Sequence, residues 1–149
     1  MAGKARFFLT EEMFKEVPHL LADANGFFVE SFRYRSGVAA LLIKNSCCSF
    51  ILLPFNGQQI WRYGTLREDF TMKSMYDEPV DTQEVFDYSY GAFLIHCGLT
   101  AMGNPSEEDD HPMHGELPGA SYKDIYLEIE RMKPAGISGP AAHSATGCR

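Results

Sequence analysis

Short apolar segments separated by turn dipeptides most limit what this chain can fold into. Residues 37–44 (GVAALLIK), 49–55 (SFILLPF) and 58–63 (QQIWRY) each have the length of a β-strand. Asn45-Ser46 separates the first two segments, and Asn56-Gly57, a strong hairpin signal, separates the second and third. Several short strands joined by tight turns are typical of β-sandwiches and barrels. The sequence therefore predicts a mainly β fold.

Other segments also favour extended structure. Asn25-Gly26 marks a turn into FFVESFRYRSG, a mixed run that contains strand-favouring aromatic residues. Residues 124–130 (DIYLEIE) alternate apolar and polar side chains, which is the pattern of a half-buried strand. Residues 92–97 (AFLIHC) form an apolar strand candidate, and residues 70–75 (FTMKSM) alternate weakly. The long polar loop before residue 124 is a natural place for a site, because rigid scaffolds present sites on loops.

A short helix is expected near the N-terminus. Thr10 suits an N-cap, Glu11 and Glu12 suit the first turn, and apolar residues follow at helical spacing. Pro18 interrupts this pattern, so a helix within residues 10–24 should be short and broken.

Length and charge limit the class of protein. A chain of 149 residues with 45% hydrophobic side chains has the size and composition of one globular domain. Its net charge of −7 disfavours nucleic acid and anionic membrane surfaces, because both attract Lys and Arg. No apolar stretch approaches the roughly 20 residues of a bilayer span, and the N-terminus lacks the pattern of a secretory signal. We therefore expect a soluble, cytoplasmic protein.

The chain changes character after residue 130. Residues 131–149 (RMKPAGISGPAAHSATGCR) contain small residues, two prolines and three glycines, and show no hydrophobic periodicity. This composition supplies no obvious strand to follow residues 124–130. We expect a β domain over residues 1–130 and an irregular or disordered tail over 131–149.

The stretch DDHPMHGELPGA, residues 109–120, gathers groups that can bind metal. His111, His114 and a nearby carboxylate would supply the three ligands of a catalytic zinc site, and His96 lies a short distance upstream. A loop bounded by prolines, however, does not enforce ligand geometry as a helix does for HExxH. The four cysteines also show no CxxC spacing. We therefore expect neither a metal nor another cofactor, and a metal-dependent cupin-like enzyme is retained as an alternative.

The same stretch also suits acid–base chemistry. A histidine exchanges protons near neutral pH when a partner holds it, and Gly115 lets a ligand approach the backbone beside His114. The simpler alternative is that His114 caps a turn, and for His111 a solvated position is preferred.

A second candidate cluster is PFNGQQIWRYG, residues 54–64. Of Gln58 and Gln59, one shares a strand face with Trp61, and an aromatic ring beside amide groups suits sugar recognition. A core tryptophan with surface glutamines explains the pattern equally well.

The order of motifs resembles a known superfamily. LPFNGQQIWRYG, FTMKSMYDEP, YGAFLIHCGLTAMGNP and HPMHGELPGASYKDIYLEIE follow one another as in the N-terminal part of the galactose mutarotase-like superfamily, and of its aldose 1-epimerase-like branch in particular. The resemblance covers about residues 26–130 and implies a β-supersandwich, here a partial one. It also implies inversion at the anomeric carbon of a sugar, with one group removing a proton and another donating one.

The resemblance assigns roles to particular residues. His114-Gly115 matches the family's first His-Gly motif, so His114 would hydrogen-bond the sugar near its ring oxygen and support catalysis. HCGLTAMG stands where better-known mutarotases carry an Asn-Arg pair. Nothing after Glu130 resembles the family's second histidine or its glutamate base, which suggests a truncated, weakly active or inactive form.

Three functions follow as hypotheses. The first is a carbohydrate-binding, aldose 1-epimerase-like isomerase that acts on a monosaccharide or sugar derivative. The second is a non-catalytic carbohydrate-binding module, and the third is the metal-dependent enzyme. A strand edge left unpaired would favour a homodimer. The catalytic candidate is His114, and the residues expected near the sugar are His96, Gln59, Trp61, Lys73 and Glu116.

Overall fold

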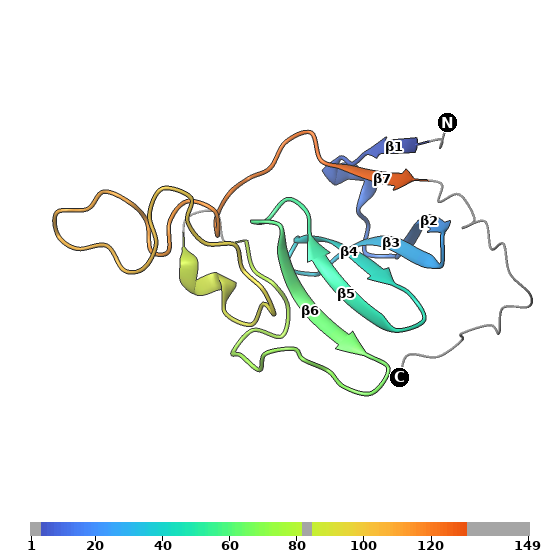
Figure 1. Ribbon diagram of the computed structural model, residues 1–149, viewed down its shortest axis with the longest axis horizontal. Helices are drawn as coiled ribbons and strands as arrows, with labels where there is room; N and C mark the ends of the chain where they lie inside the picture. Colours follow the sequence, from blue (N-terminus) through green and yellow to red (C-terminus); the bar gives the residue numbers. More distant parts are fainter. Residues whose placement is uncertain (1–3, 82–84, 131–149) are drawn as a thin grey trace, which may run out of the picture.

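The computed structural model describes residues 4–81 and 85–130 and consists of two antiparallel sheets with two short 3-10 turns (Figure 1). The mainly β fold predicted from the sequence is confirmed. None of the helices in these two ranges has the length and apolar composition that a membrane crossing requires. The predicted tail over 131–149 lies outside the described residues.

The larger sheet is a five-stranded meander in which every neighbour in sequence is a neighbour in space. Asn25-Gly26 forms the first turn with positive φ at both residues, 54° and 77°, as a two-residue hairpin requires. Asn45 Oδ1 accepts hydrogen bonds from the backbone of Cys47 and Cys48 in the third turn. The strands, in order, are β2 (His19–Ala24), β3 (Phe27–Arg33), β4 (Ala39–Lys44), β5 (Cys48–Leu53) and β6 (Gln59–Thr65).

This sheet is buried on both faces near its centre. Along β4, Ala39 and Leu41 belong to one hydrophobic cluster, and Ala40 belongs to a second cluster with Leu53 and Trp61. Because neighbouring residues of a strand point to opposite faces, the two clusters lie on opposite sides of the sheet. The apolar run of β4 is therefore continuous rather than alternating.

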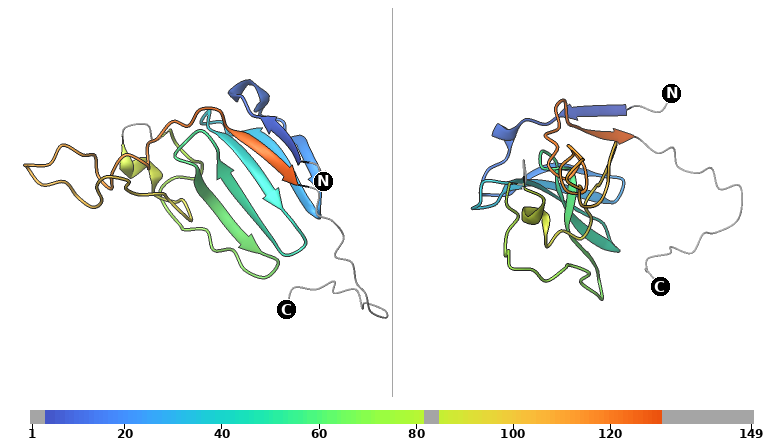
Figure 2. Two further views of the ribbon diagram at one scale, coloured as in Figure 1. Left: turned by 45° about the horizontal axis from the view of Figure 1, so that its top comes forward. Right: turned by 90° about the vertical axis from the view of Figure 1, so that its left-hand side faces the viewer.

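The smaller sheet covers one face of the larger one (Figure 2). It pairs β1 (Lys4–Phe8) with β7 (Tyr126–Glu130), and Leu127 packs against the first cluster. Glu128 accepts hydrogen bonds from Arg6 Nη2 at 2.7 Å and from Lys4 Nζ at 3.0 Å. These bonds, that of Arg6 first, lower the pKa of the Glu128 carboxyl. The half-buried strand predicted within 124–130 is confirmed over residues 126–130.

The N-terminal helix predicted within residues 10–24 is wrong. Only a 3-10 turn, η1 (Glu11–Met13), forms after Thr10, and the chain then becomes the edge strand β2. Pro18 removes a backbone donor and disfavours helix for the residue before it. The hairpin turn at Asn25-Gly26 then lets β2 pair with β3, and this pairing outweighs the helical spacing of the side chains.

The other two strand candidates, residues 92–97 and 70–75, form no strand, although isolated bridges lie within the first and just before the second. Leu94 forms an isolated bridge with Ile60 of β6, and Asp69 forms another with Gly64. A second 3-10 turn, η2 (Phe86–Ser89), lies between these two segments. The chain around these bridges lies beside β6. Ala92 and Tyr76 from this part of the chain pack in the second hydrophobic cluster.

Candidate functional site

Two of the predicted sugar-binding residues are core residues. Trp61 and Gln59, both on β6, are each 1% exposed. Trp61 packs in the second hydrophobic cluster, while Gln59 Nε2 donates to the backbone oxygen of Pro118 at 3.2 Å. Gln59 and Trp61 share a face, as their spacing predicts. Neither side chain is accessible to solvent. Gln59 packs β6 against the loop that follows Glu116.

The His114-Gly115 pair lies at a junction of two loop segments. The backbone N–H of His114 donates to Gly103 O, its carbonyl accepts from Gly98 N, and Leu117 N donates to Gly98 O. A Cβ added to Gly115 would stand 2.4 Å from Ala101 O, so the loop's own backbone occupies the space beside this glycine. The His114 ring stacks at a tilt against Phe86, with 4.4 Å between ring centroids.

Glu116 extends the same junction. Its carboxylate accepts hydrogen bonds from both the backbone N–H and the hydroxyl of Thr100 at 3.1 Å. Its own backbone N–H and those of Thr100 and Leu99 lower the pKa of Glu116. The structure thus brings His114 and Glu116 together along one junction. The hydrogen bonds to Thr100 give Glu116 a structural role there.

The remaining two candidates, His96 and Lys73, are exposed, and His96 lies two residues before Gly98 of the junction. His111 Nε2 lies 4.0 Å from Asp109 Oδ2, whose carboxylate accepts from Ser106. Across residues 4–81 and 85–130, no group of three or more His, Cys, Asp or Glu side chains is placed to hold a metal ion. The histidine set of the cupin-like alternative is therefore not assembled.

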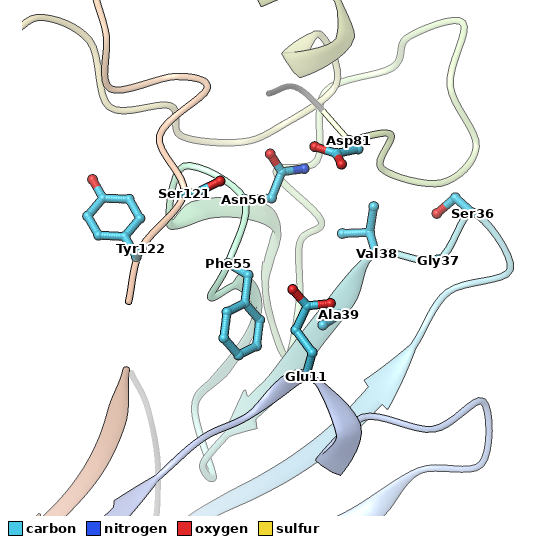
Figure 3. Close-up of a pocket in the computed structure, with 10 residues that line it drawn as sticks. All are labelled: Glu11, Ser36, Gly37, Val38, Ala39, Phe55, Asn56, Asp81, Ser121 and Tyr122. Carbon is cyan, nitrogen blue, oxygen red and sulfur yellow. The ribbon is translucent and has the colours of Figure 1, made fainter. Parts of the chain in front are cut away.

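A groove of about 290 Å³ opens elsewhere, against the start of β4 and the turn between β5 and β6 (Figure 3). Glu11 reaches it from η1, Asn56 from the β5–β6 turn and Asp81 from the segment before η2, while Tyr122 borders it from the segment that leads to β7, with its ring turned away from the other lining residues. Its remaining lining residues are Ser36, Gly37, Val38, Ala39, Phe55 and Ser121. Segments spread between residues 11 and 122 therefore converge on this groove.

The position of the β5–β6 turn is fixed from two sides. Asn56 Nδ2 donates to Val80 O at 2.9 Å, and Gly57 N donates to Ala120 O at 3.0 Å. Gly57 has a positive φ of 60°, and a Cβ there would lie 2.4 Å from Pro118 O. Only glycine allows this close approach. The turn consequently joins the two walls of the groove that carry Asp81 and Tyr122.

None of the six residues chosen from the sequence lines the groove. The segment PFNGQQIWRYG does contribute to it, through Phe55 and Asn56 rather than through Gln59 and Trp61. The Asn-Gly dipeptide was the available signal, since it marks the turn that brings Phe55 and Asn56 to the groove. Glu11, Asp81 and Tyr122 carry no local pattern that would reveal their convergence.

A comparison with protein-family models, curated proteins and solved structures found no match to this chain. The β-sandwich-like arrangement therefore rests on the two sheets themselves. The resemblance to mutarotase-like proteins stays a prediction from the motifs.

Proposed function

We propose that this protein binds a monosaccharide or sugar derivative, as a carbohydrate-binding, aldose 1-epimerase-like protein, and that the sugar occupies the groove beside β4. The observation that carries this proposal is the groove itself, in which residues from five separate segments meet. A volume of about 290 Å³ is at the lower end of the range of ligand pockets, which suits a small ligand.

The lining suits a polyhydroxylated molecule. Sugar hydroxyl groups donate and accept hydrogen bonds, and the groove offers an amide, hydroxyl groups and two carboxylates. Phe55 adds an aromatic ring, whose apolar face can contact the C–H groups of a sugar. Apolar surface with a few placed polar groups is the usual composition of a small-ligand site.

Binding without turnover is the form of the proposal that this lining favours. Inversion at an anomeric centre needs one group that accepts a proton and another that donates one. The acidic side chains of the groove are the carboxylates of Glu11 and Asp81, which are acceptors when ionised. His114, the catalytic candidate from the motifs, is not among the lining residues. The non-catalytic carbohydrate-binding module is therefore the favoured version.

Titration of glucose or galactose, followed by NMR, tests the proposal. We expect millimolar binding that Ser121→Tyr weakens at least about fivefold, because the new ring enters the groove from an exposed lining position. His114→Asn serves as the matched control. Asparagine tolerates the positive φ of 60° at this position, and binding should persist.

The outcomes separate the two candidate places for the sugar. Loss of binding in His114→Asn but not in Ser121→Tyr would move the sugar to the loop junction and restore the catalytic hypothesis for His114. No binding of either sugar at millimolar concentration would contradict the proposal. Polarimetry on freshly dissolved sugar, with the same samples, should give the rate of the buffer alone.

A further inference from the structure

We infer that the outer edge of β1 binds a second copy of this chain, and that the two β1 strands pair antiparallel about Phe7. The two smaller sheets would then join into one sheet of four strands. The inference goes beyond the proposed function, since none of the residues of β1 lines the sugar groove. It specifies the edge, the register and the residues that face one another.

β1 has one edge without a strand beside it. Among the described strands it pairs with β7 alone, and it lies above β7 at the border of the molecule in Figure 1. Leu9 N donates to Ile125 O at 2.8 Å, which continues the β1–β7 register. Because alternate residues of a strand direct their main-chain groups to alternate sides, the even-numbered residues direct theirs away from β7. These outward residues are Lys4, Arg6 and Phe8.

The opposite edge of the smaller sheet, along β7, is partly covered. Asn25 Nδ2 donates to Glu130 O at 2.7 Å, so the turn between β2 and β3 occupies an outward acceptor at the end of β7. Exposed main-chain donors and acceptors at a strand edge are a template for another strand. A second copy therefore has more of its strand edge available at β1 than at β7.

Two large apolar side chains of β1 are incompletely covered in one copy. Phe7 and Phe8 are 48% and 60% exposed, and they lie on opposite faces of the strand. Phe7 is paired with Leu127 and shares its face, which is the face toward the first hydrophobic cluster. Phe8 contacts Tyr126 on the outer face, with 5.8 Å between ring centroids. A second strand along β1 would cover more of both rings.

The charges of β1 select the register. Opposed residues share a face, so the two-fold axis passes through a residue position rather than between two positions. An axis at Arg6 would oppose two guanidinium groups, and an axis at Ala5 would oppose Lys4 and Arg6, and like charges directly opposite destabilise a sheet. An axis at Phe7 opposes Phe7 to its own copy and Arg6 to Phe8. In this register Arg6 and Phe8, whose main-chain groups point outward, form the hydrogen-bonded pairs.

A cysteine at the axis tests this register. In Phe7→Cys the two new thiols would face each other in a pair without hydrogen bonds, with about 4.5 Å between Cα atoms, where a disulfide can form. We expect mild oxidation to join two copies through position 7, as detected by mass spectrometry of the joined peptides. Ala5→Cys is the matched control on the same face. Its copies would be four residues apart, about 13 Å along the strand, and should not join.

Two substitutions of Phe8 test its partner in the second copy. Phe8→Asp and Phe8→Lys both remove the ring contact with Tyr126, but only Phe8→Asp places an opposite charge beside Arg6 of the second copy. We expect the dimer of Phe8→Lys to have a dissociation constant at least about threefold higher than that of Phe8→Asp. Light scattering over a dilution series measures both constants. Because a five-residue strand buries a small area, the dimer should dissociate on dilution.

The contrary outcomes are distinct. Joining of Ala5→Cys but not of Phe7→Cys, or equal dissociation constants for the two Phe8 variants, would overturn the inference. Oligomers larger than a dimer would overturn it as well, because they would indicate β1 paired with β7 of another copy, a contact that does not close. A protein that stays monomeric at all concentrations would overturn it and leave the proposed sugar binding unaffected.

Discussion

At position 115 the neighbouring backbone leaves room for glycine but not for a residue with a Cβ atom. Gly115 has a φ of 85°, and a Cβ would lie 2.4 Å from Ala101 O and 2.9 Å from the Cα of Gly98. Backbone atoms cannot move aside as the end of a flexible side chain can. The sequence suggested that this glycine admits a ligand, but in the structure it admits another loop segment. His114 is thereby held by main-chain hydrogen bonds on both sides.

Gly115→Ala should destabilise the protein by about 2–4 kcal/mol, because a non-glycine residue at positive φ and the displaced loop both add to the cost. Gly103→Ala is the matched control: its φ is 87°, but nothing lies within 4 Å of the added Cβ. Its cost should be about 1 kcal/mol, from the backbone conformation alone. Urea unfolding followed by the fluorescence of the single tryptophan, Trp61, measures both. Equal midpoints for the two variants would contradict the close packing at Gly115.

At the scale of elements, partners remote in sequence determine what each segment becomes. Residues 19–24 have helical spacing but pair as β2 with β3, and β7 finds its partner in β1 at the other end of the described chain. The pair of β1 with β7 depends on charge as well as on backbone bonds. Glu128 joins the two strands through Arg6 and Lys4.

The contribution of this cross-strand group should depend on pH. Hydrogen bonds from Arg6 and then Lys4 lower the pKa of Glu128, so its folded-state pKa is below that of the unfolded chain. The stabilisation is therefore present above the unfolded-state value, about 4.3, and is lost as the pH falls through the folded-state value. Glu128→Gln should lower the urea midpoint at pH 7. Near pH 2 the midpoints of the two proteins should converge, and a gap that stays constant would refute the linkage.

At the scale of the whole molecule, the two-stranded sheet has unpaired edges and exposed side chains. The sheet of β2 to β6 is covered by the smaller sheet on one face and by loops on the other, but the smaller sheet has only two strands. All five residues of β1 are exposed, including Phe7 at 48% and Phe8 at 60%. Among the described residues, neither β1 nor β7 pairs with a third strand. Such edges favour pairing with another chain.

We predict that the protein forms a homodimer through β1 and β7, with a mass near twice the 16.7 kDa of one chain. Light scattering coupled to size-exclusion chromatography measures it. Phe8→Lys should shift the population toward monomer, because it places a charge on this surface. Leu99→Lys, at a position 81% exposed in a loop, should not. A monomer at all concentrations for the unaltered protein would refute the dimer.

The local sequence could predict the turns and strands that depend on residues close to one another in the chain. Asn25-Gly26 and Asn56-Gly57 mark turns because both residues of the first and the glycine of the second adopt positive φ at low cost, and the alternation of residues 124–130 follows from the strand period of two. The central strands follow from their apolar runs. The helix within residues 10–24 failed because its spacing competes with a hairpin pairing that no local pattern reports.

The candidate site depended on contacts between distant segments. By itself, the sequence determined a mainly β chain, the positions of its central strands, and a net negative charge. Only the tertiary structure decided that Trp61 and Gln59 are buried, that Gly115 faces another loop, and that Glu11, Asn56, Asp81 and Tyr122 line one groove. The physical reason is that strand period and turn preference act over a few residues. A groove instead forms where segments many residues apart are brought together by the burial of the two hydrophobic clusters.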